Sequence, residues 1–383
     1  MTDNDKIFKV VLSNSAQFKF SRNFDETLLG EKLLRVKALY MGNRLPILPQ
    51  YADKLENDVI RKSIHGTAGI EGNPLSEEEV REVLNKSGTE KLLKDSEREI
   101  RNLQKAYLLL KQIELTTVWF RLSDNHIKKH HFLITIGLEN KDNTPGKYRS
   151  HGIIVGDKAH GGIYKPPKIG KDIKKLMSSF IEWINSVDVI SLDPIYRAAL
   201  THYHIGKIHP FGDGNGRTAR LMEASVLRTA GYKYAPEMMS NYYYRNLDKY
   251  FILFRSTIRD RKQDLTPFIE FMLDGMIWSL EQIQKKIATG IRILTLKNHF
   301  HYIRNEKSLT QRQYDLLMAL LSLDVEMFSF TPINLINDAP FAALYRNVHS
   351  RAALRDIIKL TEMGFIIFDT VDGVFKVNIN FLD

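Results

Sequence analysis

Apolar side chains recur at helical spacing in many segments of this chain. In "ADKLENDVIRKSI", Leu55, Val59, Ile60 and Ile64 fall on one face of a helix. Gly72 is expected to end that helix, because glycine readily takes the backbone conformation that follows a last helical turn. The pattern therefore predicts a helix that stops at about residue 72.

The helices that follow are predicted from their start signals as well as from their apolar faces. Pro74 prevents the first helix from continuing, and Ser76 followed by Glu79 forms a capping box that begins another. Ser123 is the predicted N-cap of a further helix. Helical patterns also run through "EREIRNLQKAYLLLKQIE", "IGKDIKKLMSSFIEWIN", "DPIYRAALTHYHIGKIH" and "RTARLMEASVLRTAGY", with more helix to about residue 295.

Two regions have residue patterns typical of strands rather than helices. The first 30 or so residues alternate loosely and read as an arm with one short strand. In "GKYRSHGIIVGDKAHGGIYKPP", two short apolar runs surround a glycine-rich middle, and Pro166 and Pro167 end the segment. This second pattern predicts a β-hairpin with a long loop.

A separate unit is predicted from about Ser308. The segments "TQRQYDLLMALL" and "HSRAALRDIIKLTEMG" read as helices, the second capped by Gly364, and a hairpin follows with its turn at Asp372-Gly373. Helices followed by a β-hairpin are the order of a winged-helix domain. We therefore expect a mainly α protein with three parts: an N-terminal helical region (1–110), a helical core with a small β-hairpin (111–290) and a winged-helix-like α+β domain (300–383).

The charge of the chain is unevenly distributed. Its 383 residues include 55 Lys and Arg against 45 Asp and Glu, a net charge of +10. From Gly290 to the end the sequence has 10 basic and 10 acidic residues, so the whole excess lies in residues 1–289. This excess favours nucleotides, nucleic acid or acidic proteins as partners of the first 289 residues.

The composition also excludes several classes of site. The chain has no cysteine, which excludes disulfides, thiolate zinc sites and cysteine nucleophiles. No apolar run approaches 18 residues, and the first residues lack a basic segment followed by an apolar core. We expect a cytoplasmic protein without a spanning helix.

The stretch "KIHPFGDGNGRTAR", residues 207–220, concentrates the candidate chemistry. It opens a helix, whose first N–H groups attract anions. Gly214 and Gly216 let the backbone come close to an anion because they lack a Cβ. Arg217 and Arg220 lie three residues apart on the first turn of that helix, which indicates a bound polyanion such as a polyphosphate.

Three further residues complete the candidate site. Asp213 is the one acid beside the glycines, and a carboxylate next to phosphate oxygens is the usual protein contribution to a Mg²⁺ site. His209 is the group in this stretch that can take a proton near neutral pH. Phe211 is expected to point into the core and fix the loop. The alternative is a glycine-rich turn with surface arginines; the histidine, acid and two arginines favour the anion site.

The motif "HPFGDGNGRTAR" resembles the signature of the Fic-domain family, HPFx[DE]GNGRxxR, at every fixed position. "GKYRSHGIIVG" and "IYKPP" resemble that family's flap, and "PIYRAALTHYHIGKIHPF" resembles the helix before its active-site loop. The resemblance covers roughly residues 30–290. It implies a Fic helical bundle that transfers AMP from ATP, with Mg²⁺, to a hydroxyl side chain of a target protein.

The resemblance also implies a role for each residue of the motif. His209 would be the general base for the target Ser, Thr or Tyr, and Asp213 would hold Mg²⁺. The anion hole would consist of Gly214, Asn215 and Gly216, Arg217 would bind the β-phosphate and Arg220 the γ-phosphate. Phe211 and Tyr250 complete the expected nucleotide-binding set, and Gly216 favours nucleotidyl transfer over phosphate transfer.

A second segment, "TAGIEGN", resembles the family's inhibitory motif [ST]xxxE[GN] through Thr67, Glu71 and Gly72. Read without that resemblance, Glu71 is a solvated acid at a helix end. The resemblance implies instead that Glu71 forms a salt bridge with Arg220 and keeps the γ-phosphate from binding productively. It also implies that Glu71 positions a water for removing AMP in some relatives.

Other features leave alternatives open. The flap at residues 149–165 is expected to align a target segment by strand addition, against the alternative of an ordinary loop. Tyr250 and Phe251 match a pair of aromatics that contact adenosine in the family, against the alternative of core packing. His202 and His204 are expected to face different ways, so we predict no transition-metal site there.

The function and partners are predicted with alternatives. The leading hypothesis is a self-inhibited protein adenylyltransferase that modifies a target protein and itself, forms a homodimer and does not use a membrane. The C-terminal unit carries Arg351, Arg355 and Lys359 on one helical face, but its neutral charge favours protein contact over DNA. A DNA-binding regulator that senses nucleotide, and a transferase with another nucleotide donor, are the alternatives.

Overall fold

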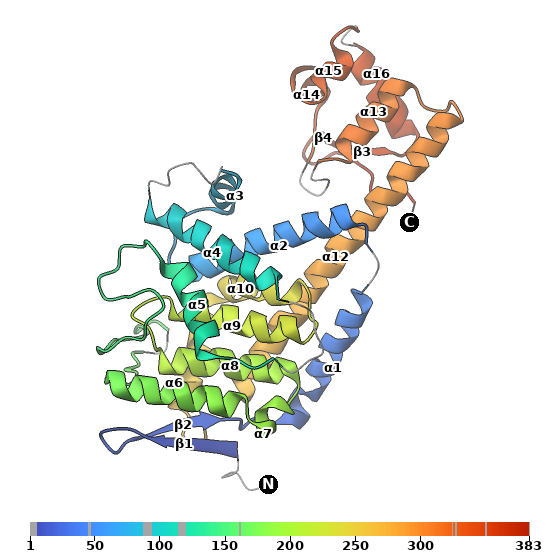
Figure 1. Cartoon of the computed structure of the whole chain (residues 1–383). Helices are drawn as coiled ribbons and strands as arrows, with labels where there is room; N and C mark the ends of the chain where they lie inside the picture. The colour runs from blue at the N-terminus through green and yellow to red at the C-terminus, as the bar shows by residue number, and fades with distance from the viewer. Residues whose placement is uncertain are drawn as a thin grey trace. The chain divides into compact units, whose positions relative to one another are not determined.

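The structure is a computed structural model that describes residues 6–44, 47–86, 94–113, 120–160, 162–323, 325, 328–348 and 351–382. It is mostly helical, which confirms the predicted fold class, and it divides into two compact units, Met1–Gln284 and Lys285–Asp383 (Figure 1). Among the described residues, no helix has the length and apolar character needed to cross a bilayer. The predicted limit at residue 110 between an N-terminal region and a catalytic core stays a prediction.

The first unit is a helical bundle that opens with a small hairpin. Strands β1 and β2 are antiparallel, with Ile7 opposite Ser21 and Val11 opposite Gln17, so the N-terminal arm holds two strands where the sequence analysis expected one. The elements are β1 (Ile7–Val11), β2 (Gln17–Ser21), α1 (Glu26–Gly42), α2 (Pro49–Ile70), α3 (Glu77–Asn85), α4 (Asp95–Lys111), α5 (Asp124–Thr135), α6 (Gly170–Ile184), α7 (Val187–Ile190), α8 (Pro194–Ile208), α9 (Asn215–Thr229), α10 (Ala235–Arg245) and α11 (Leu247–Arg259). Helix α12 (Thr266–Asn305) begins in this unit and ends in the second.

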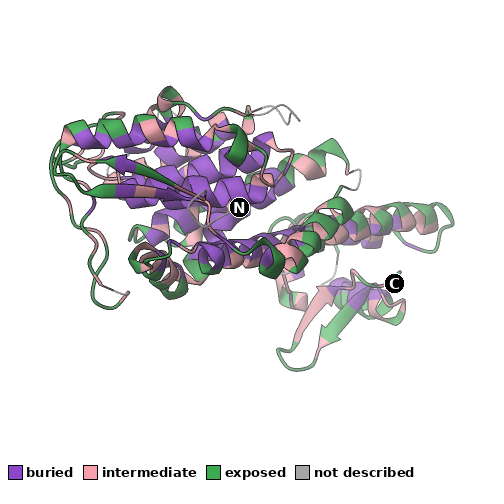
Figure 2. Cartoon of the chain, turned by 90° about the horizontal axis from the view of Figure 1, so that it is seen from below, coloured by how far each residue is buried: buried purple, intermediate pink, exposed green. Residues whose placement is uncertain are grey.

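The core of the first unit is built around α8 and α9, which pack against each other. Every residue of α8 after Pro194 is buried, and Figure 2 shows buried helical turns at the centre of this unit. Helix α2 packs along α10, with Gly66 so close to the α10 backbone that a Cβ would lie 2.8 Å from the Ser240 carbonyl oxygen. The site loop between α8 and α9 is therefore held by two rigid, buried helices.

The predicted caps at the ends of helices α2, α3 and α5 are confirmed. Ser76 Oγ accepts from the Glu79 N–H at 3.3 Å while the Glu79 carboxylate accepts from the Ser76 N–H at 2.8 Å, which is the predicted capping box. Ser123 caps α5 through the His126 N–H, and Gly72 follows α2 with a φ of 88°. These contacts satisfy helix-end groups that would otherwise lack partners.

The expected β-hairpin at the flap is reduced to one pair of hydrogen bonds. Val155 and Tyr164 exchange backbone bonds of 2.9 and 2.8 Å, and no longer strand forms among the described residues around them. Elsewhere in the segment, the carbonyl oxygens of His151 and Pro167 accept from the Arg149 guanidinium at 2.5 and 2.7 Å rather than from a facing strand. The Tyr164 hydroxyl donates to the Lys207 carbonyl at 3.0 Å, which ties the flap to the end of α8.

The second unit follows the predicted order of helices and then a hairpin. Its hairpin pairs Ile366 with Val377, and Phe330 adds one bridge to Phe375. Its identification as a winged-helix domain stays a prediction. After the end of α12 the elements are α13 (Gln311–Leu320), α14 (Pro332–Asn337), α15 (Ala342–Tyr345), α16 (Arg351–Glu362), β3 (Ile366–Asp369) and β4 (Val374–Val377).

Candidate active site

The candidate site is the loop that joins α8 to α9. His209 ends α8 in the left-handed region with a φ of 52°, which is uncommon for a residue with a Cβ. Gly214 takes a φ of 73° at the N-cap of α9, where glycine adopts the conformation without strain. These two residues set the loop so that a histidine ring and a helix N-terminus face the same space.

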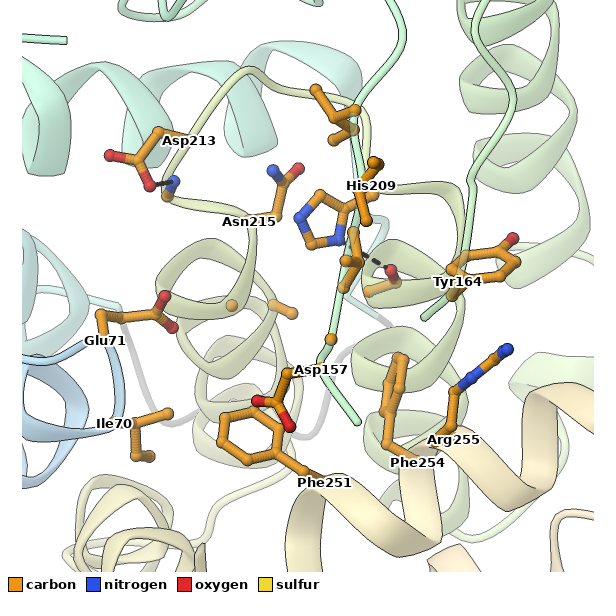
Figure 3. A pocket seen from close by; sticks show the side chains of 18 of the residues that line it. Ile70, Glu71, Asp157, Tyr164, His209, Asp213, Asn215, Phe251, Phe254 and Arg255 are labelled. Carbon is orange, nitrogen blue, oxygen red and sulfur yellow. Dashed lines mark hydrogen bonds between the residues drawn. The ribbon is translucent and has the colours of Figure 1, made fainter. Parts of the chain in front are cut away.

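His209 is arranged as a proton acceptor. Its Nδ1 lies 3.1 Å from the Gly206 carbonyl oxygen, so Nδ1 carries the hydrogen, and Nε2 has no hydrogen-bond partner among the described residues (Figure 3). Burial lowers the pKa of His209 to about 4, and the charge of Arg149 acts in the same direction. The imidazole is therefore neutral at physiological pH, which is the form that a general base requires.

Arg149 fixes the backbone that carries His209. Its side chain is buried, and its guanidinium donates to the carbonyl oxygens of His209 (2.8 Å), His151 (2.5 Å) and Pro167 (2.7 Å). One arginine thereby ties both ends of the flap to the turn at His209. Arg149 was not predicted as a site residue, because nothing in "GKYRSHGIIVG" distinguishes it from a surface arginine.

Phe211 and Asn215 hold the loop from inside. The Phe211 ring is fully buried and stacks on His131 at a centroid distance of 3.6 Å, which agrees with the predicted core position. The Asn215 side chain bonds both to the N–H and to the carbonyl of Phe211, at 2.9 and 3.0 Å. The amide of Asn215 is therefore occupied by the loop, and its backbone N–H is what it presents to an anion.

A carboxylate already lies at the anion-binding end of α9. A Cβ built on Gly216 would overlap Glu71 Oε1, so the Glu71 carboxylate is in contact with the glycine backbone. Glu71 also pairs with Arg220 at 2.7 Å. Burial raises the pKa of Glu71, but Arg220 and Arg217 outweigh it and hold the pKa below its ordinary value. The ionised carboxylate occupies the place where the sequence analysis expected phosphate oxygens.

Thr67 completes the contact between α2 and Arg220. The Arg220 Nε donates to Thr67 Oγ1 at 2.8 Å, and its Nη2 donates to the Thr67 carbonyl at 3.2 Å. Arg220 and Thr67 are both buried. Gly72 makes none of these contacts and lies in the turn after α2, where its φ is 88°. Glu71 and Arg220 are therefore brought together as the resemblance implied, and Thr67 adds contacts to Arg220 that were not predicted.

Asp213 and Arg217 form a second charged group beside the cavity. Asp213 Oδ1 accepts from the Gly214 N–H at 2.5 Å and from Arg217 at 2.9 Å. The Arg217 guanidinium also pairs with Glu99 of α4, and its side chain is only 4% exposed. Arg217 is thus turned toward α4, and it is absent from the described residues that line the cavity.

The loop opens on a cavity of about 990 Å³. His209, Asp213, Glu71 and Tyr250 all line it, as Figure 3 shows for the first three. The Tyr250 hydroxyl bonds to His202 Nε2 at 2.8 Å, while His204 bonds to the β2 backbone, so the two histidines face different ways as predicted. The flap residues Ile153 to Asp157 and the α11 aromatics Phe251 and Phe254 form other walls.

Asp213 could hold a magnesium ion only together with the oxygens of bound phosphates. Burial raises the pKa of Asp213, but Arg217 and the Gly214 N–H lower it more, so the carboxylate is ionised. Among the described residues, no group of three or more His, Asp or Glu side chains could hold a metal alone. Magnesium typically takes one or two carboxylates and completes its shell with water and phosphate oxygens, which suits Asp213.

Comparison with known proteins agrees with this geometry. Residues 121–227 match the sequence model of the Fic/DOC family. A protein adenylyltransferase Fic from Aedes aegypti is 30% identical over 246 residues, or 61% of this chain and 45% of the relative. A protein of the same name from Drosophila mojavensis is 29% identical over 239 residues, or 60% and 43%. The chain thus spans less than half the length of these relatives.

Solved structures share the fold. A Fic family protein from Desulfovibrio desulfuricans superposes with a TM-score of 0.56 at 19% identity, covering 91% of this chain and 95% of its own. A Fic domain containing signaling protein from Bacteroides thetaiotaomicron gives a TM-score of 0.56 at 21% identity, covering 67% and 96%. At these identities the likeness concerns the fold.

Proposed function

We propose that this chain is a Fic-domain protein adenylyltransferase that holds itself inactive through Glu71. The observation that carries the proposal is one cavity with two ends. At one end lies the neutral His209, whose Nδ1 bonds to the Gly206 carbonyl, and at the other lies the N-terminus of α9, where the Glu71 carboxylate rests against Gly216. A triphosphate and a hydroxyl nucleophile suit these two ends.

The proposed reaction transfers AMP to a Ser, Thr or Tyr hydroxyl of a target protein. The target oxygen attacks the α-phosphorus of ATP while His209 Nε2 takes its proton, and the bond from the α-phosphorus to the bridging oxygen breaks to release pyrophosphate. The backbone N–H groups of Gly214, Asn215 and Gly216 stabilise charge on the phosphate oxygens. The residues act by positioning and by charge, as in other phosphoryl-type transfers.

Asp213 would hold Mg²⁺ when the metal is bound, and the ion would neutralise charge between phosphate groups. Arg220 would bind the γ-phosphate once Glu71 has left it, and Arg217 would bind the β-phosphate. Tyr250 would face the adenosine from the wall formed by α11. The Glu71 carboxylate would oppose this arrangement, because it lies against Gly216 and pairs with Arg220.

The direct test is an incubation of wild type, Glu71→Gly and His209→Ala with a panel of nucleotides and Mg²⁺, read by intact mass. We expect an added AMP from ATP, strongest for Glu71→Gly and absent for His209→Ala. The same spectra show self-modification directly. If another nucleotide gives the adduct, the donor assignment is wrong while the transfer chemistry stands; if no variant gains mass with any nucleotide, the proposal fails.

Several finer points stay predictions. They are removal of AMP with Glu71 positioning a water, formation of a homodimer, a cytoplasmic location and a role of the C-terminal unit in protein contact. DNA binding by that unit is less favoured, since its 10 basic residues are matched by 10 acidic ones from Gly290 on.

A further inference from the structure

Arg217 and Arg220 are paired with more carboxylates than Glu71 alone. Three carboxylates, those of Glu71, Asp213 and Glu99, face the guanidinium groups of Arg217 and Arg220. The cluster therefore carries one net negative charge, which opposes the entry of a polyanion. Asp213 has a proposed metal role and Glu71 a proposed inhibitory role, but Glu99 has none.

Glu99 has the geometry of a strong competitor for Arg217. It lies in the second turn of α4 and forms an ion pair with Arg217 in which the exposed fractions of the two side chains are 12% and 4%. Burial strengthens such a charge-assisted contact because little water screens it. The pair directs Arg217 toward α4, consistent with its absence from the described lining of the cavity.

Glu99 is also connected to the inhibitory segment. The other carboxylate oxygen of Glu99 accepts from the Asn73 side chain at 2.8 Å, and the same Asn73 nitrogen donates to the Ser96 carbonyl at 3.1 Å. Asn73 stands two residues after Glu71, in the turn that follows α2. The segment that places Glu71 on Arg220 therefore also braces the acid that holds Arg217.

We propose that Glu99 is a second inhibitory residue, which withholds Arg217 from the β-phosphate as Glu71 withholds Arg220 from the γ-phosphate. This inference rests on the proposed nucleotide chemistry. Binding of a diphosphate or triphosphate then requires Arg217 to exchange Glu99 for a phosphate oxygen. A monophosphate does not reach Arg217 and is indifferent to Glu99.

The test measures the binding of AMP, ADP and an ATP analogue with a methylene bridge between the α- and β-phosphates. Glu99→Gln keeps the shape and the Asn73 contact but removes the charge. We expect about tenfold tighter binding of ADP and of the ATP analogue, from the loss of one charged competitor, and AMP affinity within about twofold of wild type. Glu97→Gln is the matched control, since Glu97 lies on the same helix and pairs with Lys86 at 2.7 Å.

Each other outcome overturns the inference. Unchanged ADP and analogue affinity means that Glu99 does not compete, and weaker binding means that Glu99 positions Arg217 for the nucleotide. An equal gain for AMP means that the effect is not directed at the β-phosphate. If no adenine nucleotide binds any variant, the proposed function fails together with the inference, and that result is distinct from the other three.

Two further measurements guard against a variant that does not fold. Glu99→Asp retracts the carboxylate by one methylene and should give a smaller gain in the same direction. A crystal structure of the wild-type chain with the ATP analogue should show Arg217 released from Glu99 and bonded to a β-phosphate oxygen. An intact Glu99–Arg217 pair beside a fully bound triphosphate would overturn the inference without any substitution.

Discussion

Glu71 and Arg220, separated by 149 positions in the sequence, meet at 2.7 Å across the N-terminus of α9. The same carboxylate rests on the Gly216 backbone, so one side chain fills the anion-binding site from two directions. Arg220 is buried and receives further contacts from Thr67. Helix α2 is thus attached to the site through an arginine that the proposed reaction would need.

Thr67→Val is expected to loosen this attachment without removing it. The substitution deletes the hydroxyl that accepts from Arg220 Nε, while the Thr67 carbonyl contact and the Glu71 ion pair remain. Losing one such hydrogen bond costs about 1 kcal/mol, which corresponds to about a fivefold rise in AMP transfer.

Rates of transfer from labelled ATP would check this. Thr229→Val is the control, because Thr229 is a buried threonine of α9 whose hydroxyl bonds within its own helix. A Thr67→Val rate no higher than wild type would show that the hydroxyl does not support the inhibited state.

Gly216→Ala should destabilise the wild-type chain more than it destabilises Glu71→Gly. The added Cβ overlaps Glu71 Oε1, whereas its next contact, Arg220 Nη1 at 3.1 Å, can shift. Without Glu71 the overlap is gone, and alanine within a helix is favoured over glycine by about 0.5–1 kcal/mol.

The four midpoints of thermal unfolding, for wild type, both single variants and the double variant, give the coupling between the two residues. Additive effects would mean that the Glu71 carboxylate does not rest on Gly216 in solution.

The pH dependence of transfer should be governed by a histidine of unusually low pKa. Burial lowers the pKa of His209 to about 4, and Arg149 contributes in the same direction. The base is neutral above that pKa, so kcat/KM of Glu71→Gly should be flat from about pH 6 to 8 and fall as pH drops below about 5. If the pH profile of kcat/KM instead fell with an apparent pKa near 6.5, the ordinary value for histidine, His209 would not be buried as the structure shows.

Arg149→Lys should slow transfer strongly while leaving nucleotide affinity almost unchanged. Lysine cannot reproduce the three separate contacts to the carbonyls of His209, His151 and Pro167. A base displaced by about 1 Å costs about 100-fold in rate.

Single-turnover rates and ATP affinities of Arg149→Lys, in the Glu71→Gly background, separate the two effects. Arg197→Lys is the control, since Arg197 is equally buried and bonds to Ile184 and Asn185. A loss of affinity without a loss of rate would argue against a positioning role for Arg149.

Local signals in the sequence predicted much of the fold. Ser76 with Glu79 and the stop at Gly72 depend on contacts between near neighbours, so the pattern of residues is sufficient to predict them. The second strand of the N-terminal hairpin was missed because β1 (IFKVV) does not alternate, and because β2 (QFKFS), which does, is short and depends on distant contacts such as Phe20 with Phe180 of α6. The flap was predicted as a longer hairpin because sequence alternation does not reveal that the His151 and Pro167 carbonyls bond to the Arg149 guanidinium.

Some residues of the candidate site could be predicted from the sequence, and others could not. The glycines, His209, Asp213 and the two arginines lie within 12 residues, so their chemistry can be read from spacing. The pairing of Glu71 with Arg220 followed only from the family resemblance. Glu99 was missed, because an acid in an amphipathic helix has the same pattern whether it faces water or a buried arginine 118 positions away.

We propose that Glu71 keeps a competent transferase inactive. The decisive measurement is the initial rate of AMP transfer from labelled ATP with Mg²⁺, for wild type and Glu71→Gly with His209→Ala as the blank. Coupling between two sites commonly changes a binding affinity by about 5- to 150-fold. We predict that Glu71→Gly transfers AMP faster than wild type by about tenfold or more. A rate for Glu71→Gly that equals that of wild type, at a level above the blank, would contradict the claim.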